Sequence, residues 1–129
     1  MLVPQIMSGQ TVGVLGLGSS GMAAIASLDA AGVTLFAHDD NKPDANLPNG
    51  TVMPWQDWPW SDLDALVISP GIPHLHPTPH PAAARAAAAH IEIVSEVEIA
   101  LRAAPQAPIV VITGTNGKST TTALIGHCL

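Results

Sequence analysis

The chain has 129 residues, of which 47% are hydrophobic, and it carries a formal charge of −6 with only four lysines and arginines. That length suffices for one domain with a core and little more. So little positive charge argues against general nucleic-acid binding and against an anionic membrane surface. The single cysteine, Cys128, and the lack of a signal peptide or of a long apolar run lead us to expect a cytoplasmic protein without membrane insertion.

The first forty residues have the pattern of one β-α-β unit. Residues 11–18 are apolar and β-branched and end in glycines, which predicts a buried strand and a tight turn. Residues 20–32 predict an alanine-rich helix, with Gly32 as the residue that ends it. A second strand is predicted at 33–39.

The stretch 41–64 is rich in proline, asparagine, aspartate and tryptophan. It predicts a loop with one short strand near 51–53. Three tryptophans lie within 55–60. We expect them to pin the loop to the edge of the domain, and a stacking platform for a ligand ring is the alternative.

The second half of the chain alternates again between strand and helix patterns. Ser95 and Glu98 form a predicted capping box at the start of one helix. Strands are predicted at 64–71, 91–94 and 109–113, and helices at 82–90, 95–104 and 119–129. This alternation predicts an α/β fold, with a Rossmann-like parallel sheet flanked by helices.

A proline-rich segment, 105–108, divides the chain into two unequal parts. We expect residues 1–104 to form an N-terminal domain and 105–108 to be a linker. The remaining residues, 109–129, then supply the first strand, the phosphate loop and the start of a helix of a second domain.

The sequence GLGSSG at 16–21 has the spacing G-x-G-x-x-G and stands between a predicted strand and a predicted helix. In this pattern Gly16 permits the turn, Gly18 lets a phosphate approach the backbone, and Gly21 lets the helix pack closely. The helix amides then face a pyrophosphate, with Ser19 and Ser20 as further donors. Acids at the end of the second strand, which here are Asp39 and Asp40, commonly bind a ribose. The pattern therefore predicts a nucleotide with two phosphates, without naming its base.

A second glycine loop, GTNGKST, follows the strand predicted at 109–113. Its glycines are separated by two residues, where the usual P-loop has four. Backbone amides can still form an anion nest, Lys118 can reach β- and γ-phosphates, and Ser119 can bind Mg²⁺. We expect a site for ATP made by Gly114, Thr115, Asn116, Gly117, Lys118, Ser119 and Thr120.

Taken together, the motifs resemble the Mur ligases of peptidoglycan synthesis, in particular those that add D-glutamate. The resemblance covers almost the whole chain. It is carried by VLGLGSSGMA near the start, VISPGI with HP four residues later, and IEIVSEVEIA before PIVVITGTNGKSTTTALIG.

The resemblance implies that the first domain binds the UDP part of UDP-N-acetylmuramoyl-L-alanine. Ser19, Ser20 and the loop amides would contact the diphosphate. Asp39 and Asp40 would hold the uracil and its ribose. The same crevice would be lined by Ser69, Pro70 and Gly71.

The resemblance also implies the reaction of the whole enzyme. ATP and Mg²⁺ would activate the substrate carboxylate as an acyl phosphate, which the amine of D-glutamate attacks. Lys118 and the second loop would hold the γ-phosphate, and Ser119 would bind the metal ion. No catalytic residue falls within positions 1–129, so we expect these residues alone to bind UDP and to be inactive as a ligase.

Three alternatives remain open. The first glycine loop could belong to an NAD-dependent oxidoreductase, although such an enzyme needs no second phosphate loop, or to a nucleotide-sugar sensor without catalytic activity. His74, His76 and His80 could bind zinc, but the prolines around them favour exposed loop histidines.

Overall fold

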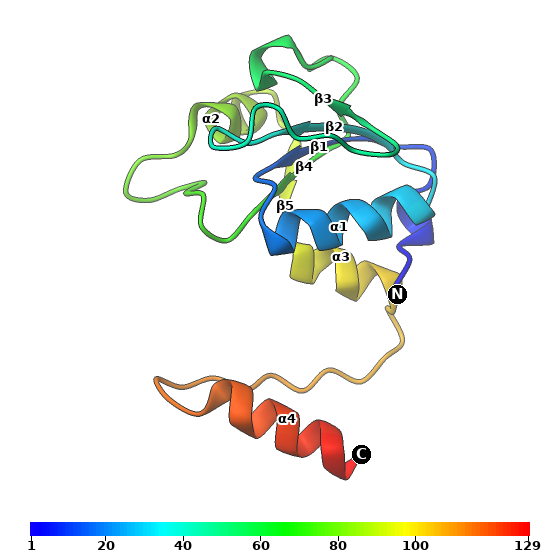
Figure 1. The fold of residues 1–129 in the computed structure, drawn as a ribbon, viewed down its shortest axis with the longest axis vertical. Coiled ribbons are helices and arrows are strands. Elements are labelled where there is room, and N and C mark those ends of the chain that lie inside the picture. Colours follow the sequence, from blue (N-terminus) through cyan, green and yellow to red (C-terminus); the bar gives the residue numbers. More distant parts are fainter.

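A five-stranded parallel sheet forms the centre of the chain in the computed structural model, which describes residues 1–129 (Figure 1). The strand order is β3-β2-β1-β4-β5, so the predicted α/β fold with a Rossmann-like sheet is confirmed. The strands are β1 (Thr11–Leu15), β2 (Thr34–His38), β3 (Thr51–Val52), β4 (Ala65–Ile68) and β5 (Glu92–Val94). The helices are α1 (Ser19–Ala30), α2 (Pro81–Ala88), α3 (Glu96–Ala103) and α4 (Lys118–Cys128), with short 3₁₀ turns at Gln5–Met7 and Trp55–Asp57.

Helices cover both faces of this sheet, with α1 and α3 side by side on one face and α2 on the other (Figure 1). Val12 and Val14 of β1 point into the larger core beneath α1 and α3. Leu15 belongs to the core on the α2 side, together with Leu66 and the buried alanines of α2. Burial on both faces explains why β1 and β4 are almost wholly apolar.

Buried tryptophans hold the loop in place, as expected, but Trp58 does so on the central strand β1 and not at the edge of the domain. The Trp58 side chain is 4% exposed, and a Cβ added to Gly13 would lie 2.5 Å from its ring. Trp60 Nε1 donates to the backbone carbonyl of Trp55 at 2.8 Å, which ties the loop to itself. A glycine at position 13 therefore leaves the room that the Trp58 ring needs beside the central strand.

The structure contains the predicted end of α1 at Gly32 and the predicted start of α3 at Ser95. Gly32 follows α1 with φ +75°, its amide donates to Asp29 O, and the amide of Val33 donates to Leu28 O. This pair of bonds is a Schellman motif. At α3, Ser95 Oγ accepts from the amide of Glu98 at 3.2 Å. The reciprocal half of the capping box is absent, because the Glu98 carboxylate pairs with Arg102 at 3.0 Å.

Replacing Ser95 by alanine is expected to lower the free energy of unfolding by about 1 kcal/mol, because the amide of Glu98 loses its acceptor. Urea denaturation followed by circular dichroism measures this loss. Ser95→Asp restores an acceptor at the same place and should recover most of it. An equal loss in both variants would show that the loss does not come from the missing acceptor.

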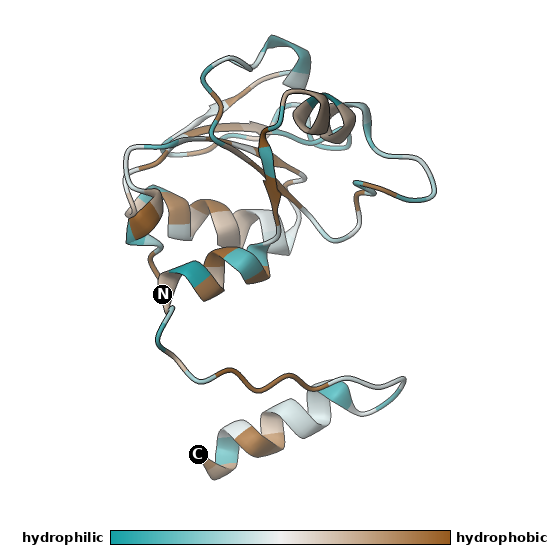
Figure 2. Cartoon of the chain, turned by 180° about the vertical axis from the view of Figure 1, so that it is seen from behind, coloured by the Kyte–Doolittle hydropathy of each residue, from teal (hydrophilic) through white to brown (hydrophobic).

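The strand predicted at 109–113 is wrong. These residues are extended but pair with no other strand, and Ile109, Val110 and Val111 are 61%, 70% and 82% exposed. The segment has the apolar pattern of a strand, but a strand forms only where a neighbour offers hydrogen-bond partners. Figure 2 shows this segment as a brown stretch that leads to α4, and α4 has no buried residue. None of the helices is long and apolar enough to cross a membrane.

Candidate functional site

A cleft opens beyond the carboxyl ends of β1, β2 and β4. Strands β2 and β3 follow on one side of β1, and the chain then crosses to β4 on the other side, so this is the point where the strand order reverses. Ligands of open parallel sheets bind at such points. The cleft has a volume of about 430 Å³ and is lined by Gly16, Gly18, Ser19, Ser20, Asp39, Asp40, Asn41, Ser69, Pro70, Gly71 and Ile72.

All but one of the residues predicted for the UDP site thus line one cleft. The exception is Gly21, which faces the backbone of Gly16 instead. A Cβ at Gly21 would lie 1.9 Å from the carbonyl oxygen of Gly16, so this glycine lets α1 pack against the loop. Gly16 itself has φ +95°, and Ser69 Oγ donates to its carbonyl at 3.2 Å. A Cβ at Gly18 meets nothing within 4 Å. Within this loop, Gly18 is therefore the glycine that leaves room for a ligand.

The amino end of α1 opens into this cleft without a cap. Gly18 is the N-cap residue and no side chain bonds there. The first amide of the helix with a backbone acceptor is that of Met22, which donates to Gly18 O at 2.9 Å. The preceding amides and the hydroxyls of Ser19 and Ser20 are left to bind an anion, which the helix dipole also favours.

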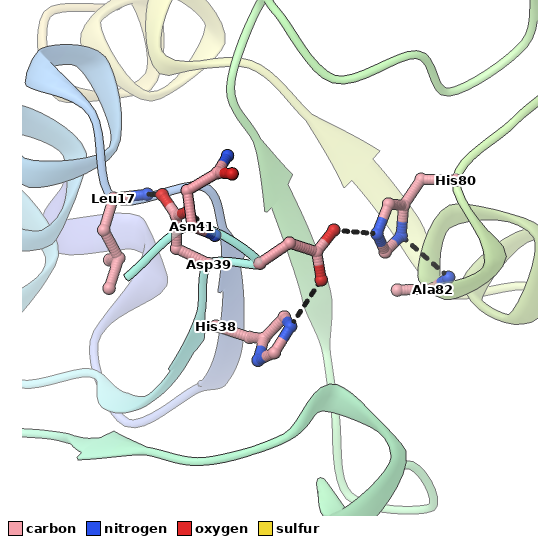
Figure 3. A network of polar contacts seen from close by, with 7 residues as sticks. Leu17, His38, Asp39, Asn41, His80 and Ala82 are labelled. Carbon is pink, nitrogen blue, oxygen red and sulfur yellow. Dashed lines mark hydrogen bonds and ion pairs between the residues drawn. The ribbon is translucent and has the colours of Figure 1, made fainter. Parts of the chain in front are cut away.

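Asp39 organises the backbone of the cleft (Figure 3). Its Oδ2 accepts from the amide of Leu17 at 2.6 Å, and its Oδ1 accepts from the amide of Asn41 at 2.8 Å. One bond holds the glycine loop and the other holds the turn after β2. Each carboxylate oxygen keeps a second lone pair, so Asp39 can still accept from a ligand hydroxyl.

Replacing Asp39 by alanine is expected to cost about 2 kcal/mol of stability, because the amide of Leu17, a residue 2% exposed, is left without an acceptor. Chemical denaturation measures the change. Asp44→Ala is a suitable control, because Asp44 lies in an exposed turn and has no side-chain hydrogen bond. Equal losses in the two variants would contradict the role given to Asp39.

Asp40 joins two histidines, His38 at the end of β2 and His80 before α2, and both are labelled in Figure 3. His38 Nε2 is 2.9 Å from Asp40 Oδ1, and His80 Nε2 is 3.2 Å from Asp40 Oδ2. His80 Nδ1 accepts from the amide of Ala82 at 3.1 Å and caps α2, which places its proton on Nε2. The hydrogen bond from His38, followed by that from His80, holds the pKa of Asp40 below its ordinary value.

His80 is thus not an exposed loop histidine, which corrects one expectation. Its side chain is 14% exposed, whereas His74 and His76 are exposed. Capping α2 and bonding Asp40 account for the difference. The chain contains no group of three or more histidine, cysteine, aspartate or glutamate side chains arranged to hold a metal ion.

The Asp40 carboxyl is expected to titrate below its ordinary value of 3.8. A depressed pKa means that the contribution of its two imidazole contacts to stability is complete above pH 3.8 and is lost as the pH falls through the folded-state value. Carboxyl ¹³C NMR measures the midpoint. His38→Phe removes the larger cause and should raise the midpoint towards 3.8, and an unchanged midpoint would contradict the assignment.

Sequence reasoning missed several residues of this region: His38, Lys42 and Ile72. Lys42 Nζ donates to the carbonyl of Leu17 at 2.7 Å, so it reaches the glycine loop from the turn after β2. A lysine three residues past the end of a predicted strand was a signal for this position. The contacts of His38 had no such signal, because the turn after β2 brings Asp40 to it.

The second glycine loop lies apart from the cleft. Gly114 and Gly117 have φ values of +148° and +78°, and Lys118 Nζ donates to the carbonyl of Gly114 at 2.5 Å. Gly117 is the N-cap of α4 and no side chain bonds there, so the amides that begin this helix are free as well. Loop residues 114–120 are exposed, and none of them lines the cleft described above.

Comparison with known proteins finds several relatives that carry the same name. No protein-family model matches the chain. UDP-N-acetylmuramoylalanine–D-glutamate ligase from Rhodopseudomonas palustris (strain HaA2) is 45% identical over an alignment of 129 positions, which covers 95% of this chain and 28% of that protein. The ligases of the same name from Paramagnetospirillum magneticum and Brucella abortus (strain 2308) are 43% and 42% identical, over 100% and 93% of this chain and 29% and 27% of their own lengths. The chain therefore spans between a quarter and a third of the relatives it matches, at their N-terminal end.

Proposed function

Because the chain belongs to the family of the UDP-N-acetylmuramoylalanine–D-glutamate ligases, whose N-terminal region it matches, we propose that its cleft holds the UDP part of UDP-N-acetylmuramoyl-L-alanine. The observation that carries this proposal is the uncapped start of α1 behind Gly18, at the point where the strand order reverses. Free amides, two hydroxyls and an open glycine suit a diphosphate.

Each part of the ligand has a place in this cleft. The amides after Gly18 and the hydroxyls of Ser19 and Ser20 bind the diphosphate. Asp39 and Asp40, at the end of β2, accept from the ribose and the uracil. The wall opposite is formed by Ser69, Pro70 and Gly71, at the end of β4.

We further propose that residues 1–104 are the UDP-substrate domain, 105–108 a linker, and 109–129 the start of an ATP-binding domain. The second loop fits a nucleotide, because Gly114 and Gly117 take positive φ and the first amides of α4 are uncapped. In the whole enzyme Lys118 would hold the γ-phosphate and Ser119 would bind Mg²⁺. ATP would supply the phosphoryl group that activates the substrate carboxylate for amide formation with D-glutamate.

No residue of this chain is assigned to catalysis, and we place the protein in the cytoplasm on the basis of its single cysteine. The chain alone, given UDP-N-acetylmuramoyl-L-alanine, D-glutamate, ATP and Mg²⁺, should release no ADP. Release of ADP at the rate of a complete ligase would contradict the proposal that this chain alone is inactive as a ligase.

Thermal unfolding in the presence of UDP, NAD and ATP tests the proposed ligand. UDP at one hundred times its dissociation constant should stabilise the chain by about 2.7 kcal/mol. NAD should give no comparable shift, because the comparisons favour a UDP-sugar ligase. Stabilisation by NAD and none by UDP would replace the proposal with a dinucleotide-binding module of an oxidoreductase.

A further inference from the structure

The cleft has an unbalanced charge. Its lining includes the carboxylates Asp39 and Asp40 and neither a lysine nor an arginine. A nucleoside diphosphate would bring further negative charge to the same place. Backbone amides and a helix terminus offset part of it, but they carry only partial charges. A full positive charge close to the loop would be worth considerably more.

Of the four cations in the chain, three are engaged elsewhere. The Arg85 guanidinium lies 4.7 Å from the centre of the Trp60 ring, on the α2 side of the sheet. Arg102 pairs with Glu92 and Glu98. Lys118 bonds within the second glycine loop. This leaves Lys42, which takes part in none of the ion pairs of the structure.

Lys42 is held beside the phosphate loop by a defined turn. Its own amide donates to Asp39 O at 3.1 Å, and Asp39 Oδ1 accepts from the amide of Asn41, so the backbone reverses directly after β2. The side chain then reaches back, and Nζ lies 2.7 Å from the carbonyl oxygen of Leu17. Leu17 is the residue between Gly16 and Gly18. An ammonium group has three N–H donors, and this contact uses one of them.

We propose that Lys42 is the phosphate-binding cation of this cleft, with a free N–H directed to the diphosphate while the carbonyl of Leu17 holds the ammonium in place. This inference rests on the proposed UDP function and assigns to it a specific charged residue. Lys42 therefore selects for the phosphates of the ligand and not for its nucleoside.

The test compares UDP with uridine on the full chain. Calorimetry measures UDP, and ¹⁵N NMR titration measures the weaker nucleoside. Lys42→Met should weaken UDP binding by about ten- to a hundredfold, the range expected when a hydrogen bond to a charged group is lost. Its affinity for uridine should stay within about twofold of the parent chain, because a nucleoside has no phosphate for the cation to bind. Lys42→Arg keeps the charge and should retain most of the UDP affinity.

Arg85→Gln is the matched control, because it removes one positive charge at a residue that packs over Trp60 and bonds to the carbonyl of Gln56, and not to the glycine loop. It should leave UDP binding unchanged. If Lys42→Met binds UDP as the parent chain does, or loses UDP and uridine affinity equally, Lys42 is not a phosphate ligand and the inference is overturned. If the parent chain itself binds no UDP, the proposed function fails, and this inference fails with it.

Discussion

Replacing Gly21 by alanine is expected to lower the free energy of unfolding by about 3 kcal/mol, at the upper end for bulk added to a packed site. The new Cβ would lie 1.9 Å from the carbonyl oxygen of Gly16 and 3.3 Å from Ser69 Oγ. The first of these is a backbone atom, and it cannot rotate away. Helix α1 would have to move from β1, which would also disturb the larger core beneath α1 and α3.

Urea denaturation measures this loss, and Gly126→Ala is its control. Gly126 also lies in a helix, α4, and a Cβ there meets nothing within 4 Å. Because alanine is the better helix former, that control should be neutral or slightly stabilised. A Gly21→Ala chain as stable as the parent would show that α1 does not need the close approach.

Replacing Gly18 by alanine is expected to change the stability of the chain little and to weaken UDP binding strongly. A Cβ at Gly18 meets no atom, and φ −75° is open to any residue, so stability should fall by about 1 kcal/mol at most, the cost of a poorer N-cap. The methyl group would stand in the cleft where a phosphate must approach the amides. Loss of two such hydrogen bonds to a charged group predicts UDP binding weaker by about a hundredfold or more.

Calorimetry on a folded Gly18→Ala chain separates these two effects. Gly71→Ala is the comparison, because Gly71 also lines the cleft with open space around it but lies after β4, away from the start of α1. We expect it to weaken UDP binding less than Gly18→Ala does. Unchanged UDP affinity in Gly18→Ala would remove the diphosphate from the place we assign to it.

Local signals in the sequence were enough to predict most of the fold. Gly32 and Ser95 end and begin helices through bonds to residues only a few positions away, so their roles depend on little else. The apolar runs of β1 and β4 are long enough to indicate strands buried on both faces. The strand predicted at 109–113 failed for the opposite reason, because pairing depends on a neighbour that no local pattern can supply.

Most of the candidate site could also be predicted from the sequence. Parallel strands end at one edge of a sheet, so residues after β1, β2 and β4 had to meet there, and they do. The contact between His80 and Asp40 was not predictable, since it joins residues 40 positions apart. Lys42 had a local signal, three residues past a predicted strand, but its contact with the glycine loop depends on the turn that Asp39 builds. The ligand contacts themselves remain predictions.

Mapping of UDP on the ¹⁵N-labelled chain tests the central claim most directly. We expect the largest shift changes at the amides of Gly18, Ser19, Ser20 and Gly21, with smaller ones at Asp40 and Gly71 and none at residues 114–120. Changes confined to 114–120, or the absence of any change at UDP concentrations up to the millimolar range, would contradict the assignment of this cleft to a UDP-linked substrate.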